Sequence, residues 1–137
     1  MVDRDIVQNR ISYIEENLRL MSELANLAEE EFLSRFYYVA SAKYLLQTSV
    51  EAMLDIAHHI IARRRYRVPQ SYAEAFVILV EYGVLPAEKK ETYTRIAKFR
   101  NRVVHLYHDV DSKEVFRILK EGIGDIKAFI GAILSCI

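Results

Sequence analysis

The sequence has few residues that interrupt helices and almost none that cross-link a chain. Its 137 residues include four glycines, two prolines and no tryptophan, and Cys136 is the only cysteine. So few breakers predict long elements, and a single cysteine excludes a disulfide within the chain, which suits a reducing compartment. There is no long apolar run, and the charged start MVDRDIVQNR lacks the apolar core of a secretory signal. We therefore expect a cytoplasmic protein that does not engage a membrane.

The charge of the chain is balanced. Lys and Arg together number 19, as do Asp and Glu, so the formal net charge is zero. This balance excludes a generally basic nucleic-acid coat protein but leaves room for a local basic patch. It also leaves little repulsion between copies. The length is that of one domain, so we expect a single domain over residues 1–137.

Apolar spacing predicts helices throughout. Steps of three and four residues indicate a first helix at about residues 3–26, through Val7, Ile11, Ile14, Leu18 and Met21. A wider apolar stripe indicates a long central helix over about 30–64, which Pro69 follows. Further helices are expected at about 71–81, 87–106 and 112–135, and the S-Y-A-E run at 71–74 predicts a capping box. No strand pattern is present. We expect an all-α fold, an antiparallel bundle of four or five helices.

The run FRNRVVHLYHDVD, residues 99–111, concentrates ionisable side chains at the end of the fourth expected helix. An arginine offers a planar fork of donors to a phosphate oxygen, as Arg100 would. A histidine such as His105 moves protons near neutral pH. With RNA the 2′-hydroxyl is already present as a nucleophile, so no metal or covalent intermediate is needed. Asn101 is a candidate for orienting the imidazole, and Tyr107 for contacting phosphate or base.

Helical geometry leaves the pairing of these side chains open. Arg100 and Tyr107, seven residues apart, share a face, whereas His105 lies roughly 140° around the axis from Arg100. The side chains of Arg100 and His105 can meet only through the length of the arginine, a loosening of the helix near Leu106, or a second copy of the segment. The plainer interpretation is a solvated helix C-terminus whose cations match the helix dipole, with the histidine as a satisfied polar group.

Three stretches of the chain resemble one family. The run R-N-R-V-V-H-L-Y, 100–107, is similar to the R-x4-H-x-Y form of the HEPN motif found in HepT-like toxins, and H-D-V-D follows it as in that group. The stretch A-M-L-D-I-A-H-H-I-I-A-R-R resembles the long central helix of the family. S-Y-A-E-A-F-V-I-L-V-E-Y-G-V-L-P resembles the next segment. The resemblance extends from about residue 3 to residue 130.

The resemblance implies a homodimeric, HEPN-like ribonuclease toxin in which two motifs meet at a basic cleft. Arg100 and His105 match the catalytic positions, and Asn101 matches the polar residue of active members. No metal and no cofactor are implied. The implied partners are RNA and an MntA-like nucleotidyltransferase antitoxin, and Tyr107 resembles the tyrosine that is adenylylated. The alternative is a non-catalytic accessory subunit of a minimal nucleotidyltransferase that binds a nucleotide or RNA.

Secondary features admit two interpretations each. Four arginines, each near the end of an expected helix, either contact RNA or the antitoxin or are cations that keep the chain soluble. They are Arg63, Arg64, Arg65 and Arg102. Glu51 and Asp55 either hold an arginine or form a solvated face, and the solvated face is favoured. Adjacent His58 and His59 diverge by about 100° on a helix and lack further ligands, so a metal site there is disfavoured.

Overall fold

The computed structural model describes all residues, 1–137, and contains helices without strands. The all-α expectation is confirmed, but there are six α-helices rather than four or five. They are α1 (Arg4–Ala25), α2 (Glu29–Ser34), α3 (Phe36–Arg63), α4 (Tyr72–Glu81), α5 (Lys90–His105) and α6 (Ser112–Cys136). Two single-turn 3-10 helices, η1 (Ala87–Lys89) and η2 (Tyr107–Asp109), precede and follow α5. No helix is long and apolar enough to cross a membrane.

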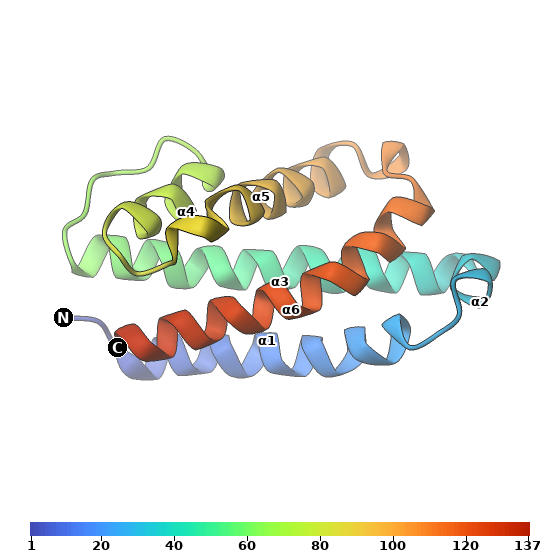
Figure 1. The fold of residues 1–137 in the computed structure, drawn as a ribbon, viewed down its shortest axis with the longest axis horizontal. Coiled ribbons are helices and arrows are strands. Elements are labelled where there is room, and N and C mark those ends of the chain that lie inside the picture. Colours follow the sequence, from blue (N-terminus) through green and yellow to red (C-terminus); the bar gives the residue numbers. More distant parts are fainter.

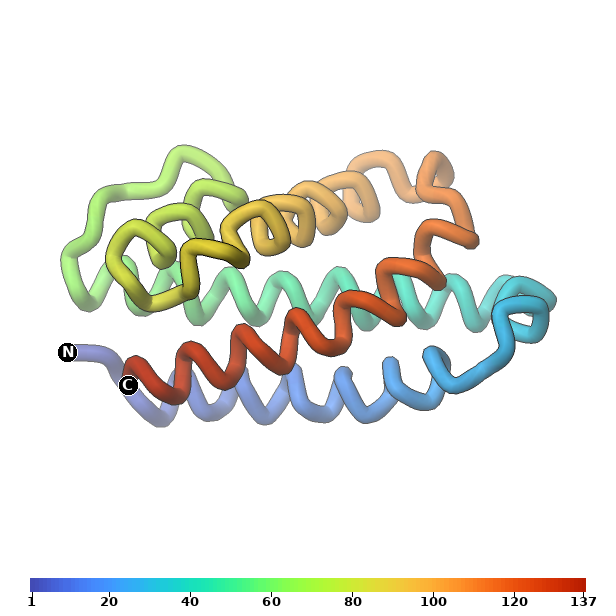
Figure 2. Tube along the Cα trace, viewed as in Figure 1, coloured from blue at the N-terminus to red at the C-terminus, as the bar shows by residue number.

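The long helix α3 forms the middle of the bundle. It packs against all five other α-helices. Figure 1 shows α1 and α6 along one side of it and α4 and α5 along the other, with both termini at the same end of the molecule. The tube in Figure 2 shows the same arrangement, with α5 leading through η2 into the start of α6. The α4–α5 pair therefore places the motif against α3.

The expected helix over residues 30–64 is broken at one residue. Arg35 adopts an extended conformation (φ −130°, ψ 124°) and separates α2 from α3. The hydroxyl of Ser34 donates to the carbonyl of Glu31 (2.6 Å), a local bond that competes with helix continuation. The resulting turn lets α2 insert Phe32 against Phe116 of α6, with ring centroids 4.8 Å apart. The break is therefore a packing requirement that the apolar period of the sequence does not reveal.

The start of α4 matches the sequence-based expectation. The hydroxyl of Ser71 accepts from the amide of Glu74 (3.1 Å), as a capping box requires. The Glu74 carboxylate accepts from the amide of Gln70 (2.9 Å) rather than from that of Ser71. At the other end Gly83 has a φ of +76°, a left-handed conformation that ends the helix without steric cost.

The interior is one cluster of 37 buried apolar residues. Phe76 of α4, Tyr93 of α5 and Phe129 of α6 form an aromatic contact among themselves, with centroids 5.8–5.9 Å apart. The Tyr93 hydroxyl is buried without a hydrogen-bond partner. Burial, aided by the charge of Asp125, raises the pKa of Tyr93 to about 12. This contact fixes one face of α5, so its remaining surface points to α3 or to solvent.

Candidate active site

The motif straddles the end of a helix. α5 ends at His105, and Leu106 leaves the helical region (φ −132°, ψ 45°) while its amide still reaches the carbonyl of Arg102 (2.7 Å). The chain then makes the single turn of η2, which carries Tyr107. The loosening near Leu106 that the sequence geometry suggested is therefore present, but it begins after the histidine. Tyr107 consequently does not continue the helical face of Arg100.

Arg100 is held firmly against α3. Its Nε and Nη2 both donate to Oε2 of Glu51, at 3.1 and 2.7 Å, and its Nη1 donates to Oδ1 of Asn101 at 3.2 Å. The guanidinium also lies over the ring of Tyr72, 4.9 Å from its centroid, and the side chain is only 14% exposed. Of the five N–H donors of a guanidinium, three are engaged and two are left for a ligand. The arginine is thus oriented before any substrate arrives.

His105, unlike Arg100, is not held in place by other side chains of the chain. Its side chain is exposed and forms no hydrogen bond within the chain. Its neighbours Val104 and Leu106 expose 38% and 52% of their surfaces. Asn101 bonds to Arg100 and not to the imidazole, contrary to the role expected for it. One chain therefore brings Arg100, Asn101 and Glu51 together but leaves His105 apart from them.

Tyr107 is anchored by a buried lysine. Lys43 of α3 is 6% exposed, and its Nζ donates to the Tyr107 carbonyl (3.0 Å) and lies 3.9 Å from the centroid of the Tyr107 ring. Both contacts are to the same residue, so Lys43 ties η2 to the centre of the bundle. Burial lowers the pKa of Lys43 below its ordinary value. Tyr107 as a whole remains 39% exposed.

The arginines at the end of α3 separate in the fold. Arg64 donates to the carbonyl (2.8 Å) and the sulfur (2.9 Å) of Cys136, so it satisfies the C-terminal end of α6. Arg63 and Arg65 are exposed. These positions lie at the end of α3 and just after it, near the end of the molecule where the termini meet (Figure 1). The motif lies at the C-terminal end of α5, toward the opposite end of the molecule.

Arg102 is paired within the chain. Its two Nη atoms donate to the two carboxylate oxygens of Glu114 on α6, at 2.9 and 2.8 Å. This two-point contact raises the pKa of Arg102 and lowers that of Glu114, chiefly through the hydrogen bonds. Arg102 thereby ties α5 to the start of α6.

Sequence reasoning missed two side chains of the site and undervalued a third. Lys43 was not singled out, although a lysine within the apolar run VASAKYLL is a signal of a buried cation with a partner. Tyr72, whose ring lies under the guanidinium of Arg100, belongs to no local pattern that points to that contact. For Glu51 the favoured solvated face is wrong, and the other alternative, a bond to an arginine, is the one present, because it binds Arg100. Asp55 pairs with Arg10 at 3.2 Å, but at least half of each side chain stays exposed, so Asp55 does lie on a solvated face.

The adjacent histidines of α3 make separate contacts. Nε2 of His59 accepts from the amide of Asp3 (3.0 Å), at the start of α1, and the His58 ring lies 6.1 Å from that of Tyr72. No group of three or more His, Cys, Asp or Glu side chains is arranged so that it could hold a metal ion.

Known proteins resemble the chain along most of its length. The model of the family described as "Ribonuclease HepT-like" matches residues 14–133. The tRNA nuclease HepT of Aphanizomenon flos-aquae is 30% identical over 111 residues, which cover 81% of this chain and 76% of that protein. The mRNA nuclease HepT of Shewanella oneidensis is 25% identical over 129 residues, 94% of this chain and 96% of that one.

Solved structures share the fold. The tri-AMPylated HEPN toxin of Shewanella oneidensis, in complex with its MNT antitoxin, superposes with a TM-score of 0.89 over 97% of this chain and 99% of the toxin, at 24% identity. A toxin–antitoxin complex with AMP-PNP gives the same TM-score at 23% identity, over 96% and 99% of the two chains. The cytosolic protein YutE of Bacillus subtilis, of unknown function, gives 0.85 at 22% identity, over 98% and 90%.

Proposed function

The chain belongs to the ribonuclease HepT-like family, and on that premise we propose that it is a metal-independent endoribonuclease toxin whose Arg100 and His105 cut RNA at a cleft between two copies. The observation that carries this proposal is the state of Arg100. Glu51, Asn101 and Tyr72 hold its guanidinium in one orientation while two donors remain free. An arginine prepared in this way is suited to bind a phosphate oxygen.

The reaction follows from the two side chains. His105 removes the proton of the RNA 2′-hydroxyl, whose oxygen attacks the adjacent phosphorus. A bond forms from the 2′-oxygen to phosphorus, and the bond to the 5′-oxygen breaks. The departing 5′-oxygen takes a proton from an imidazolium. Arg100 stabilises the extra negative charge of the pentacoordinate phosphorus. The products are a 2′,3′-cyclic phosphate and a 5′-hydroxyl.

A second copy supplies what one chain lacks. Arg100 and His105 project from α5 in directions roughly 140° apart, and no contact joins them. The aliphatic side chains of Val104 and Leu106, on either side of His105, are exposed, and such residues favour an interface. In our proposal a twofold contact through the end of α5 brings His105 of one copy to Arg100 of the other.

We further propose that a nucleotidyltransferase antitoxin silences the toxin by adding AMP to Tyr107. The support is a solved relative that is an AMPylated toxin bound to an MNT antitoxin, together with the exposure of Tyr107 on the short turn η2. A nucleotide on this residue adds negative charge beside the site and opposes the approach of RNA phosphates. Arg63 and Arg65 are available to contact RNA or the antitoxin.

The first experiment measures RNA cleavage with EDTA present. His105→Ala is expected to lower the rate by about 100-fold or more, since general acid–base catalysis contributes at least that much. Arg100→Ala is expected to lose a similar factor. The mass of each variant is measured by light scattering to confirm an unchanged oligomeric state. Cleavage by either variant at the parental rate contradicts the catalytic assignment. RNA binding without cleavage by the parent under any condition favours the accessory-subunit alternative.

The second experiment tests the shared cleft. Arg100→Ala and His105→Ala chains are co-expressed, so that half of the dimers are mixed. A mixed dimer retains one Arg100 and one His105, contributed by different copies. If the two act together across the interface, activity returns, up to roughly one quarter of the parental value for a symmetric dimer with two equivalent pairings. No recovery in purified mixed dimers means that each copy uses its own pair.

A further inference from the structure

One face of α5 carries a line of cations that ends at the histidine. Arg95, Lys98, Arg102 and His105 are separated by steps of three, four and three residues, so they form a single stripe on the helix surface. The stripe is about 15 Å long at the helical rise. Arg95, Lys98 and His105 are exposed, and Arg102 is half-buried. Arg100 lies on the other side of α5, against α3.

A groove runs beside this stripe. It lies between α5 and α6 and has a volume of about 350 Å³. Ile96, Phe99 and Ile118 contribute its apolar lining, and Gly122 is the α6 position that adds no side chain. Phe99 is buried, so it presents no open aromatic face for stacking. The groove is therefore lined by charged side chains together with a few apolar ones.

The carboxylates on the α6 side of the groove are already paired. Glu114 binds Arg102, Glu121 binds Arg117 at 3.3 Å, and Asp125 binds Lys89 at 3.2 Å, with the cation acting as donor in each pair. Arg95 and Lys98 form no ion pair within the chain. These two cations can therefore bind an anion without first breaking a salt bridge.

We propose that Arg95 and Lys98 bind the RNA backbone next to the scissile phosphate and lead the strand along α5 to His105. This inference rests on the proposed function, since it extends the same substrate. A groove with unpaired cations and no stacking surface recognises phosphates rather than bases. A protein partner would instead seek an apolar centre with exposed aromatic residues. We call Arg95 and Lys98 the phosphate track. Because these side chains contact only the RNA backbone, the track accepts strands of many sequences and positions them through charge.

The binding experiment uses an inactive background. RNA affinity is measured by fluorescence anisotropy with labelled single-stranded RNA and His105→Ala protein, across a series of salt concentrations. Adding Arg95→Ala and Lys98→Ala removes two phosphate contacts, so the slope of log K against log salt should fall by about 1.4, and the affinity at ~0.15 M salt should fall about tenfold.

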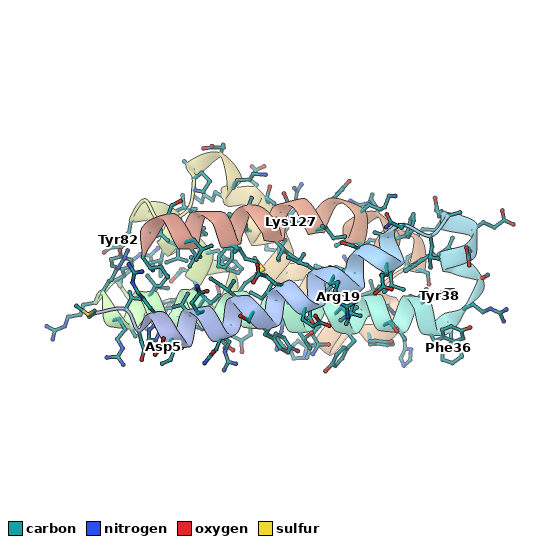
Figure 3. All side chains as sticks on the ribbon, turned by 90° about the horizontal axis from the view of Figure 1, so that it is seen from below. Asp5, Arg19, Phe36, Tyr38, Tyr82 and Lys127 are labelled. Atoms are coloured by element: carbon teal, nitrogen blue, oxygen red, sulfur yellow. The ribbon has the colours of Figure 1, made fainter.

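A matched control removes the same charges elsewhere. Arg19 and Lys127 line a groove between α1 and α6 on another face of the molecule, and Figure 3 labels both. Arg19→Ala with Lys127→Ala also removes one arginine and one lysine, and it should leave the salt slope unchanged. An equal effect of both double variants overturns the proposal, because it would show that only the overall charge matters.

A cleavage experiment separates the track from the chemistry. In the active protein, Arg95→Ala with Lys98→Ala should raise KM for long RNA about tenfold, with the loss falling on KM rather than kcat. If the parent does not cleave RNA but the salt slopes differ as expected, the ribonuclease function fails while the track stands. If RNA affinity is unchanged and binding to the nucleotidyltransferase antitoxin is lost instead, the groove is a protein interface and the track is refuted.

Discussion

Substitution of Glu51 tests whether the orientation of Arg100 matters for cleavage. Glu51→Ala removes the acceptor of two hydrogen bonds, of 3.1 and 2.7 Å, from the guanidinium. The Asn101 contact and the Tyr72 ring remain. An arginine side chain carries about 2 kcal/mol of rotamer freedom, part of which the loss of Glu51 returns to Arg100. If that ordering must be regained in the transition state, the rate falls by at most roughly 30-fold, at about 1.4 kcal/mol per factor of ten.

The assay is single-turnover cleavage with the protein in excess, alongside RNA affinity in the His105→Ala background. The loss should appear in the cleavage rate, while affinity stays level or rises, since a negative charge near the phosphate site has been removed. Glu51→Gln retains a carbonyl acceptor and should lose less than Glu51→Ala. Thermal unfolding of both variants checks that the fold is intact.

Three results would refute the positioning role of Glu51. Cleavage by Glu51→Ala at the parental rate would show that Asn101 and Tyr72 suffice. Faster cleavage would show that the carboxylate competes with the phosphate for Arg100, so that Glu51 restrains the enzyme. Equal losses in affinity and rate would indicate that Arg100 acts only in binding.

Two further predictions concern buried polar groups, and urea denaturation at several pH values measures both. Tyr93→Phe removes a hydroxyl that lacks a partner, so the free energy of unfolding should stay level or rise by about 1 kcal/mol. The pKa of Tyr93 is about 12 in the folded chain and 10.0 otherwise, so the parent should lose stability between pH 10 and 12 and the variant should lose less. Equal losses in parent and variant would refute this reasoning. Lys43→Met removes the anchor of Tyr107, so amide exchange in residues 106–110 should accelerate and RNA cleavage should slow. Because burial lowers the pKa of Lys43 from its ordinary 10.5, the parent should gain stability as pH rises through the window just below 10.5, and this gain should be absent from the variant. Unchanged amide exchange in η2 would mean that Lys43 does not anchor that turn.

Local patterns in the sequence predict the helices well, because apolar spacing and caps are local properties. The bounds of α1 and the cap at Ser71 follow from such patterns. The break at Arg35 does not, because the contact between Phe32 and Phe116 that requires it joins residues far apart in the chain.

The candidate site divides in the same way. The motif predicts which residues carry the proposed chemistry, and a loosening of the helix near Leu106 is one of the alternatives that its spacing allows. The partners of those residues come from other helices: Glu51 and Lys43 from α3 and Tyr72 from α4. Such partners depend on the register between packed helices, which a single sequence does not encode in any local pattern. Arg64 is a further case, since its bonds to Cys136 depend on two helix ends meeting.

The uneven distribution of charge affects how the protein meets nucleic acid in the cell. α5 carries five cations and a single carboxylate, within a chain whose formal net charge is zero. At a distance the positive and negative contributions cancel, and salt screens what remains beyond about 8 Å. Bulk RNA and DNA therefore exert little long-range pull on the molecule. Attraction grows only when a strand comes within reach of the basic helix, so binding depends on close encounters with α5 and not on the charge of the whole molecule.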